Sequence, residues 1–528
     1  MDGWMNNCLT EHELCRRREA SSTFRPNRLL QLSPSGTFRL VSGGECPAAS
    51  KYAALSYCWG KQPAESLLML TRTTAQYLQQ ENRVESLPKT FREAIEIVQR
   101  YQVDYLWVDR LCIYQDSVDD WQREAATMKD VYQHAHFSIA ALGASDSDGG
   151  CFFERDPSRV APTMVRVKTA EDEVEAAYVS ELDRSISWYY AFASEPLVQR
   201  SWVVQERLLA PRTLYFGSRQ VFWECREARC AETDQSRISI GGADEDQRAK
   251  STHESPCLWK TLLDGPDVST GEDKVEQLFL DWIALVAYYT DRELTVHTDK
   301  LVAISGLAKD MRAALNRLKP GKHHRYLAGL WEEQFPDGLM WCVAGPAQRR
   351  DTYRAPTWSW ASLDGRLSMQ PLPEMGRILF AAVLSATMTF QSEDDTGEVE
   401  SAALTLRGPF AAAIIDVGGT VEISHFDNVK AILRFRGRDG DMQPEDQAMK
   451  GYSWYDGTFD SMEDVAEEVF VLWIKLSAPP RNLMEGLLLA DAANGNFRRI
   501  GIASSHFGSR EEAVSFIGQF EERKVVLV

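Results

Sequence analysis

The chain has 528 residues, of which 44% are hydrophobic and 26% are charged, and its net charge is −19. This composition is ordinary for a globular protein, and the length calls for more than one domain because single hydrophobic cores stop growing well below it. The acidic balance argues against a general affinity for nucleic acid or anionic membranes, since both attract basic surfaces.

The N-terminal residues lack the apolar core of a signal sequence. The longest clean apolar run beside a predicted helix, 282–289, is far too short for a membrane span. We therefore expect a cytoplasmic protein without a membrane span. Ten cysteines at irregular spacing fit reduced thiols better than a disulfide scaffold.

One group of N-terminal residues has a spacing that is compatible with metal ligands. Cys8, His12 and Cys15 form the pattern C-x3-H-x2-C, and Cys46 is the nearest residue that could act as a fourth ligand. The spacing matches no standard zinc finger, so we expect these thiols to be reduced and metal-free. A second pair, made by Cys225 and Cys230, is a weaker metal motif still. We predict no metal and no cofactor.

Strands and helices alternate in the sequence between residues 52 and 142. In order, these are a strand at 52–60, a helix at 87–101, a strand at 103–109, a helix that begins after Ser117 and a strand at 136–142. This β-α-β-α-β order predicts a parallel sheet covered by helices, with 53–58, 104–109 and 137–142 as neighbouring strands. Ligand sites in such sheets lie beyond the carboxyl ends of the strands.

The remaining sequence predicts a helical middle and a β-rich end. The predicted elements are a short helix at 200–211, a hairpin turning at Gly217-Ser218, helices over 272–318 with a break at 294–298, and an antiparallel β region from Ala402 on. Polar stretches at 231–255 and 391–400 indicate surface loops or linkers. The predicted divisions are an N-terminal segment 1–50, a domain 51–230, a mainly helical region 256–390 and a β-rich region 401–528.

Four ordered motifs in this chain resemble the fungal heterokaryon-incompatibility (HET) domain family. They are YAALSYCWG, LPKTFREAI, YLWVDRLCIYQ with DWQREAATMKDVYQHA behind it, and RSWVVQERLLAPR, and together they span about residues 51–215. Three further stretches resemble long members of the family: LTVHTDKLVAISGLA, YLAGLWEEQF and APTWSWASLDG. The chain departs from the usual pattern at Tyr114, where Asp or Asn is common, and at Cys58, where Val or Thr is common. It also lacks the GxxxxGK[ST] motif of an NTP-driven sensor.

The resemblance implies a fungal protein of non-self recognition and programmed cell death that acts with an incompatibility partner protein. It also implies a flavodoxin-like, TIR-like parallel βα domain at the N-terminal side. Some TIR domains cleave NAD with a glutamate, so an NAD glycohydrolase-like activity on a nucleotide is one expectation. One alternative is an enzyme of a fungal secondary-metabolite pathway that acts on a small molecule. The other is a non-catalytic interaction scaffold.

Glu206 is the first candidate for a catalytic residue. It stands between the apolar pairs Val203-Val204 and Leu208-Leu209, so the fold is expected to bury it at least in part. Burial raises the pKa of a carboxyl group, and a carboxylate stabilises the cationic transition state of glycosidic cleavage. The alternative is a structural ion pair with Arg200 or Arg207.

Asp109 and Glu124 are the other two catalytic candidates. Asp109 ends a predicted strand, where it either orients a ligand or caps the next turn. Glu124 either borders the apolar stripe of its helix or is a solvated helix acid.

The candidate ligand-binding residues come from the same motifs: Ser56, Trp59, Trp107, Cys112, Gln115, Arg200, Trp202 and Gln205. The tryptophans offer flat faces for stacking, with core packing as the alternative, and Cys112 is either a pocket residue or a small buried filler. We predict that Asp109, Gln115 and Glu206 converge on one pocket at the carboxyl edge of the sheet.

Overall fold

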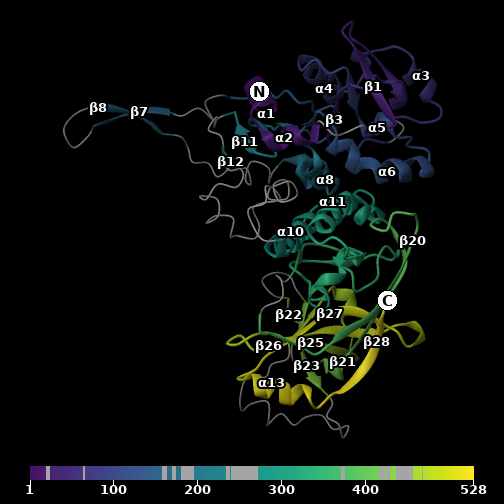
Figure 1. Cartoon of the computed structure of the whole chain (residues 1–528), viewed down its shortest axis with the longest axis vertical. Coiled ribbons are helices and arrows are strands. Elements are labelled where there is room, and N and C mark those ends of the chain that lie inside the picture. Colours follow the sequence, from purple (N-terminus) through teal and green to yellow (C-terminus); the bar gives the residue numbers. More distant parts are fainter. Residues whose placement is uncertain are drawn as a thin grey trace. The chain divides into compact units, whose positions relative to one another are not determined.

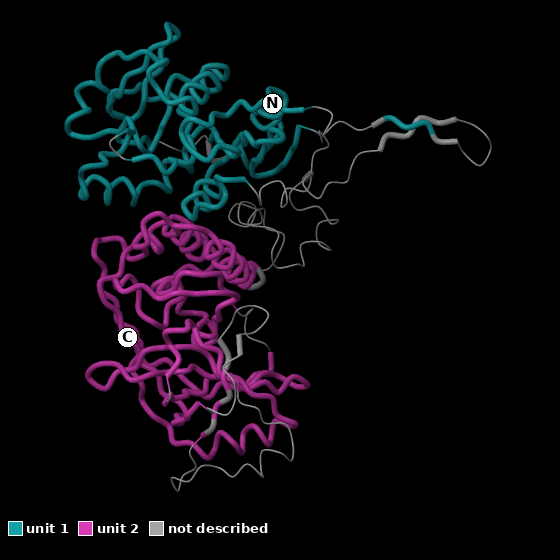
Figure 2. The backbone as a smooth tube through the Cα atoms, turned by 180° about the vertical axis from the view of Figure 1, so that it is seen from behind, with its two compact units in different colours: residues 1–266 teal, residues 267–528 magenta. Residues whose placement is uncertain are grey.

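The chain folds into two compact units, Met1–Pro266 and Asp267–Val528 (Figure 2). The computed structural model describes residues 1–19, 24–63, 66–156, 163–168, 174–179, 195–232, 238–239, 271–369, 375–415, 422–423, 429–435, 456–466 and 468–528. Most of the linker predicted at 231–255 lies outside the described residues. No helix in the described parts of the chain is both long enough and apolar enough to cross a membrane.

The first unit is built on one sheet, to which ten strands contribute among the described residues. In chain order they are β1 (Arg28–Ser33), β2 (Thr37–Ser42), β3 (Tyr52–Ser56), β4 (Asn82–Arg83), β5 (Tyr105–Trp107), β6 (Phe137–Ala140), β9 (Arg212–Phe216), β10 (Val221–Cys225), β11 (Ala228–Ala231) and β12 (Ile238–Ser239). Their order across the sheet is β12-β11-β10-β9-β6-β3-β5-β1-β2-β4 (Figure 1).

Helices and one separate hairpin complete the described part of the first unit (Figure 1). The helices are α1 (Asp2–Thr10), α2 (Glu13–Glu19), α3 (Ala75–Gln79), α4 (Lys89–Arg100), α5 (Asp109–Cys112), α6 (Val118–Gln133) and α8 (Trp202–Leu209). The hairpin consists of β7 (Thr163–Lys168) and β8 (Val174–Val179).

The centre of this sheet is parallel, which confirms the predicted neighbours. Strand β3 pairs in parallel with β5 on one side and with β6 on the other, and β6 pairs in parallel with β9. The sheet as a whole is mixed, because antiparallel strands extend it at both edges. Strands β1 and β2 come from the segment 1–50, for which the sequence predicted no strands.

The predicted helices form for the reasons that their sequences suggest. Helix α4 follows Pro88 and buries Phe91, Ala94 and Ile95, which the i, i+3, i+4 spacing places on one face. Helix α6 begins after Ser117, whose side chain accepts the Asp120 backbone N–H at 3.3 Å, the N-cap that the sequence predicts.

The carboxyl ends of the parallel strands form the edge at which a ligand site is expected. After β3 the chain crosses to β5 on one side and later reaches β6 on the other side, so the direction of winding changes between β3 and β6. Loops that leave such a switch point diverge and leave a crevice between them. The loop after β3 turns at Gly60, which has a φ of +91° and lies against Asp146.

The second unit combines two long helices with an antiparallel β-rich region, as the sequence predicts. Its helices are α10 (Gly271–Thr290), α11 (Val302–Leu318) and α13 (Arg510–Ile517). Its short paired strands are β13 (Tyr326–Leu327), β14 (Leu330–Trp331), β15 (Cys342–Val343), β16 (Gln348–Arg349), β17 (Leu363–Asp364) and β18 (Leu367–Ser368).

The large sheet of the second unit surrounds a core that includes Trp473, Phe459 and Leu488. Its strands are β19 (Ile378–Leu379), β20 (Ala382–Phe390), β21 (Val399–Ile415), β22 (Glu422–Ile423), β23 (Val429–Phe435), β24 (Asp456–Phe459), β25 (Glu468–Leu476), β26 (Leu483–Asp491), β27 (Phe497–His506) and β28 (Glu521–Leu527). The described strands of this sheet pair antiparallel, except that β27 meets β28 in parallel. The polar stretch at 391–400 forms the hairpin connection between β20 and β21, and its last two residues are the first two of β21.

We predict that Gly60→Ala destabilises the protein by about 3 kcal/mol or more, because the new Cβ adds a clash to the strain of a positive φ. An added Cβ would lie 2.6 Å from the Cβ of Asp146. Gly36→Ala is the matched control: its φ is +78° but its surroundings are open within 4 Å, so only the strain of about 1 kcal/mol applies. Denaturant unfolding of the full chain measures both losses, and equal losses would contradict the packing argument.

Candidate functional site

Glu206 is a nearly buried acid on α8, a helix that packs against α6. Its side chain is only 7% exposed, and its Oε2 atom has no hydrogen-bond partner among the described residues. Burial raises the pKa of Glu206 to about 7, against the opposing effect of the positively charged Arg200. Near neutral pH the carboxyl group therefore exists in both protonation states, as acid–base chemistry requires.

Two polar side chains from other elements lie beside Glu206 and lower its pKa. Ser56 is the last residue of β3 and is 5% exposed, and its Oγ atom has no hydrogen-bond partner among the described residues. Tyr132, near the end of α6, donates its hydroxyl to the Leu55 carbonyl oxygen at 3.2 Å. Burial raises the pKa of Tyr132 well above its ordinary value, as do the negative charges of Glu206 and Asp109. Strand β3, helix α6 and helix α8 therefore contribute to one cluster.

Asp109 belongs to the same cluster, because its negative charge raises the pKa of Glu206. Its carboxylate accepts hydrogen bonds from the indole Nε1 of Trp59 at 2.8 Å and from the backbone N–H of Arg110 at 2.6 Å. The structure thus brings Asp109 near Glu206, and the pocket that the two would share with Gln115 stays a prediction. Gln115 binds within its own turn instead, where its amide donates to the Asp109 carbonyl at 3.3 Å and to the Ile113 carbonyl at 2.9 Å.

The segment that carries Glu206 supplies the other predicted ligand-binding residues. Arg200 is half-buried and donates to the Tyr57 carbonyl oxygen in the loop after β3. Gln205 is 1% exposed, with no partner for its Oε1 atom in the described parts of the chain. Trp202 is half-buried at the start of α8. Arg207 pairs with Glu224 at 3.1 Å, so the predicted alternative of a Glu206–Arg207 ion pair is wrong.

Three predicted site residues have contacts typical of structural groups. Glu124 is 2% exposed and accepts hydrogen bonds from Arg28 at 2.7 Å and from Asn27 at 2.9 Å, so the alternative of a solvated helix acid is wrong. Cys112 is fully buried, which raises its pKa to about 12 and makes it a poor nucleophile. Trp107 is buried in β5 and meets the ring of Tyr132 edge to face at 5.8 Å.

Two further residues, which the sequence did not reveal as site residues, complete this edge of the sheet. Tyr132 is one of them, and only tertiary packing shows that its hydroxyl faces Glu206. Arg110 is fully buried, with its guanidinium 4.7 Å from the centre of the Phe91 ring and 5.9 Å from that of Tyr57. Its place directly after Asp109 was the one local signal, and the sequence alone could not show that it is buried.

The N-terminal Cys and His residues form a second cluster in the same unit. The thiols of Cys8 and Cys15 and the imidazole of His12 lie together, but the fourth member is Cys225 at the end of β10. Cys46, which the sequence suggested, bonds instead to the Ser42 carbonyl oxygen.

The first unit is thus an α/β domain with a buried acid among aromatic and basic side chains at the carboxyl ends of its parallel strands. Residues 52–206 match the model of the family described as heterokaryon incompatibility protein (HET). This segment begins at β3, ends at Glu206 and contains every member of the acid cluster, so the resemblance found in the sequence is confirmed over these residues. No curated protein and no solved structure matches the chain.

We predict that Glu206→Gln changes stability in a pH-dependent way. The folded protein holds the Glu206 proton up to a pKa of about 7, against an ordinary value of 4.5. The stability that this proton contributes is complete below pH 4.5 and is lost as the pH rises through 7. Glutamine cannot ionise, so the variant should match the wild type near pH 4.5 and exceed its stability by up to about 3 kcal/mol at pH 8.

Glu124→Gln is the matched control for this measurement, because Glu124 is also buried but is paired with Arg28 at 2.7 Å. Breaking a buried pair leaves an uncompensated charge and costs about 3 kcal/mol or more. The control should therefore be less stable than the wild type at both pH values in denaturant titrations. If Glu206→Gln loses stability at pH 8 as the control does, Glu206 is a structural ion-pair residue.

Proposed function

We propose that this protein acts in fungal heterokaryon incompatibility, and that its first unit cleaves the glycosidic bond of a nucleotide such as NAD. The family match over residues 52–206 supports the biological role, including non-self recognition, programmed cell death and interaction with an incompatibility partner protein. The burial of Glu206 beside the carboxyl end of β3, with one carboxylate oxygen unpartnered among the described residues, is the observation that carries the chemistry.

The order of the parallel strands supports a flavodoxin-like, TIR-like core. Numbered along the chain, the four central strands lie in the order second, first, third, fourth, as β5-β3-β6-β9. Flavodoxin-like sheets have the order 2-1-3-4-5 and bind their ligands where the winding direction changes. The acid cluster lies at the corresponding place, beside the carboxyl end of the first parallel strand.

The chemistry that we propose breaks the bond between a ribose carbon and the nitrogen of the leaving base. Positive charge develops on the ribose as this bond lengthens, and a nearby carboxylate stabilises it. Glu206 is surrounded by little water, so its charge acts strongly once it is ionised. Arg200 favours the ionised form, since its positive charge lowers the pKa of Glu206. Water then completes the hydrolysis at the ribose carbon.

The neighbouring residues are suited to position a nucleotide. Trp59 and Trp202 are half-buried, which leaves part of each ring for stacking against a flat base. Asp109 is held by Trp59 and by the backbone of Arg110, so it presents a fixed acceptor for a ligand hydroxyl.

We place this activity in the cytoplasm. The nine cysteines among the described residues are all free thiols, which suits a reducing compartment.

The proposed reaction predicts that purified full-length protein consumes NAD and releases nicotinamide, and that Glu206→Gln reduces the rate by about a hundredfold or more. Glu96→Gln is the matched control, because it makes the same substitution at an exposed position of α4 and should keep the wild-type rate. The rate should rise with pH through about 7, since the stabilising form of Glu206 is the ionised one.

Induced expression in a fungal host extends this test to the cell, with viability and cellular NAD as the two readouts. Wild type and Glu96→Gln should lower both, whereas Glu206→Gln should lower neither. A product made from a pathway intermediate, with NAD untouched, would favour a biosynthetic enzyme. Cell death that persists in Glu206→Gln would favour a non-catalytic scaffold, and either result would overturn the proposed reaction.

A further inference from the structure

Four buried side chains outside the acid cluster form a set of metal-ligand type, here called the Cys–His cluster: Cys8, His12, Cys15 and Cys225. Their ligand atoms all lie within 4.8 Å of one another. The His12 Nδ1 atom is 3.1 Å from the Cys225 Sγ atom. In a tetrahedral zinc site, bonds of ~2.0–2.3 Å place the ligand atoms roughly 3.5–3.8 Å apart, so one ion can reach all four atoms after small side-chain movements.

We propose that the Cys–His cluster binds one structural zinc ion. Three thiolates and one imidazole make a closed tetrahedral set of the kind found in structural zinc sites. Soft sulfur ligands favour zinc over magnesium or calcium, which prefer oxygen. All four positions are filled by protein groups, so the ion has no open position for a substrate and serves the fold rather than a reaction.

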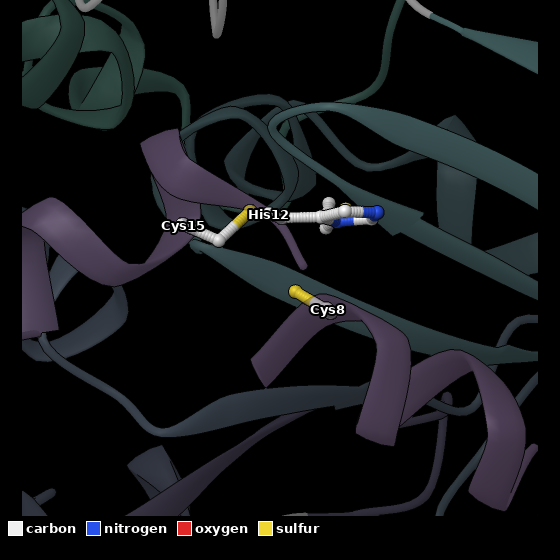
Figure 3. Close-up of side chains that lie close together, drawn as sticks. Cys8, His12 and Cys15 are labelled. Atoms are coloured by element: carbon white, nitrogen blue, oxygen red, sulfur yellow. The ribbon is translucent and has the colours of Figure 1, made fainter. Parts of the chain in front are cut away.

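The place of the four residues in the chain also fits a metal site. Figure 3 shows Cys8 on α1 and Cys15 on α2, close to the side chain of His12, which comes from the connection between these two short helices. Cys225 reaches the same region from the sheet, more than two hundred residues later in the chain. Helices of this length are marginal alone in water, so a cross-link to the sheet would hold them in place.

The turn between β10 and β11 is arranged to support a thiolate at Cys225. The backbone N–H groups of Glu227 and Ala228, which belong to this turn and its end, donate hydrogen bonds to the Cys225 sulfur. A thiolate is the form of cysteine that binds a metal.

Two further contacts describe the surroundings of the cluster. The Glu227 side chain accepts the Leu14 backbone N–H at 2.6 Å, which ties this turn to the start of α2 independently of any metal. The Nδ1 atom of His12 faces the Cys225 sulfur, and its other ring nitrogen, Nε2, is buried without a hydrogen-bond partner in the described parts of the chain. We propose a bound zinc ion here in place of the metal-free thiols that the sequence spacing favours.

Elemental analysis of full-length protein purified without chelator or added metal tests the proposal. We expect about one zinc per chain in the wild type and almost none in Cys225→Ser. Cys230→Ser is the matched control, because Cys230 is also buried in this hairpin but lies outside the cluster, and it should keep its zinc. Zinc-free wild type, or full zinc in Cys225→Ser, would overturn the proposal.

Cobalt substitution keeps the test decisive if Cys225→Ser fails to fold. Wild-type protein is stripped of metal under reducing conditions and refolded with Co²⁺. We expect strong thiolate-to-metal absorption together with the intense visible bands of tetrahedral cobalt. Co²⁺ that gives only the weak spectrum of an oxygen-bound ion would contradict a site made of three thiolates. Neither readout depends on the activity of Glu206.

Discussion

The parallel pairing of β3 with β5 on one side and with β6 on the other is the constraint on which the acid cluster depends. Parallel pairing places the carboxyl ends of adjacent strands at one edge, so Ser56 and Asp109 arrive there from separate stretches of sequence. Helix α6 returns the chain to the amino end of β3, where Tyr52 donates to the Val131 carbonyl oxygen, and the side chain of Tyr132 reaches along the sheet to the Leu55 carbonyl oxygen. Glu206 comes last along the chain, on the helix that leads into β9, and β9 pairs in parallel with β6.

Glu124, Glu224 and Glu206 are all buried in the first unit, but they differ in whether an arginine pairs with them. Glu124 is neutralised by Arg28, and Glu224 lies between Arg207 and Arg229 and accepts the Tyr215 hydroxyl at 2.7 Å. Glu206 has no ion pair among the described residues, although the positive charge of Arg200 lowers its pKa. A buried acid without a partner costs stability, and natural proteins keep such groups mainly where chemistry or binding uses them. This contrast is the physical reason why we treat Glu206 as the candidate catalytic residue and Glu124 and Glu224 as structural ion-pair residues.

How much of the structure could be predicted from the sequence depended on how close together in the chain the interacting residues lie. The start of α6 after Ser117 follows from residues close together in the chain, and the parallel neighbours of β3 follow from the alternation of strands and helices, so both were predicted. Strands β1 and β2, which form a hairpin, were not predicted, and the pairing of β1 with β5 is decided by contacts across the sheet. Arg28 lies at the start of β1, so its ion pair with Glu124 could not be predicted either. Likewise, Cys8 gave no sign of Cys225 as a neighbour, because no local spacing encodes a contact between a helix and a distant hairpin.

The two clusters of the first unit are linked through the order of its strands. Cys225 closes β10 opposite Arg212 in β9, and β9 is joined in parallel to β6. Helix α8, with Glu206, runs directly into β9, so the position of this strand fixes the end of the helix. Any cross-link between Cys225 and the N-terminal helices therefore also restrains the pair of strands β9 and β10. Helix α8 is connected to this pair through β9. A buried acid keeps a raised pKa only while its surroundings exclude water, and that exclusion requires α8 to stay packed against α6. The Cys–His cluster is thus placed where added rigidity would preserve the electrostatics of Glu206 without contact with it.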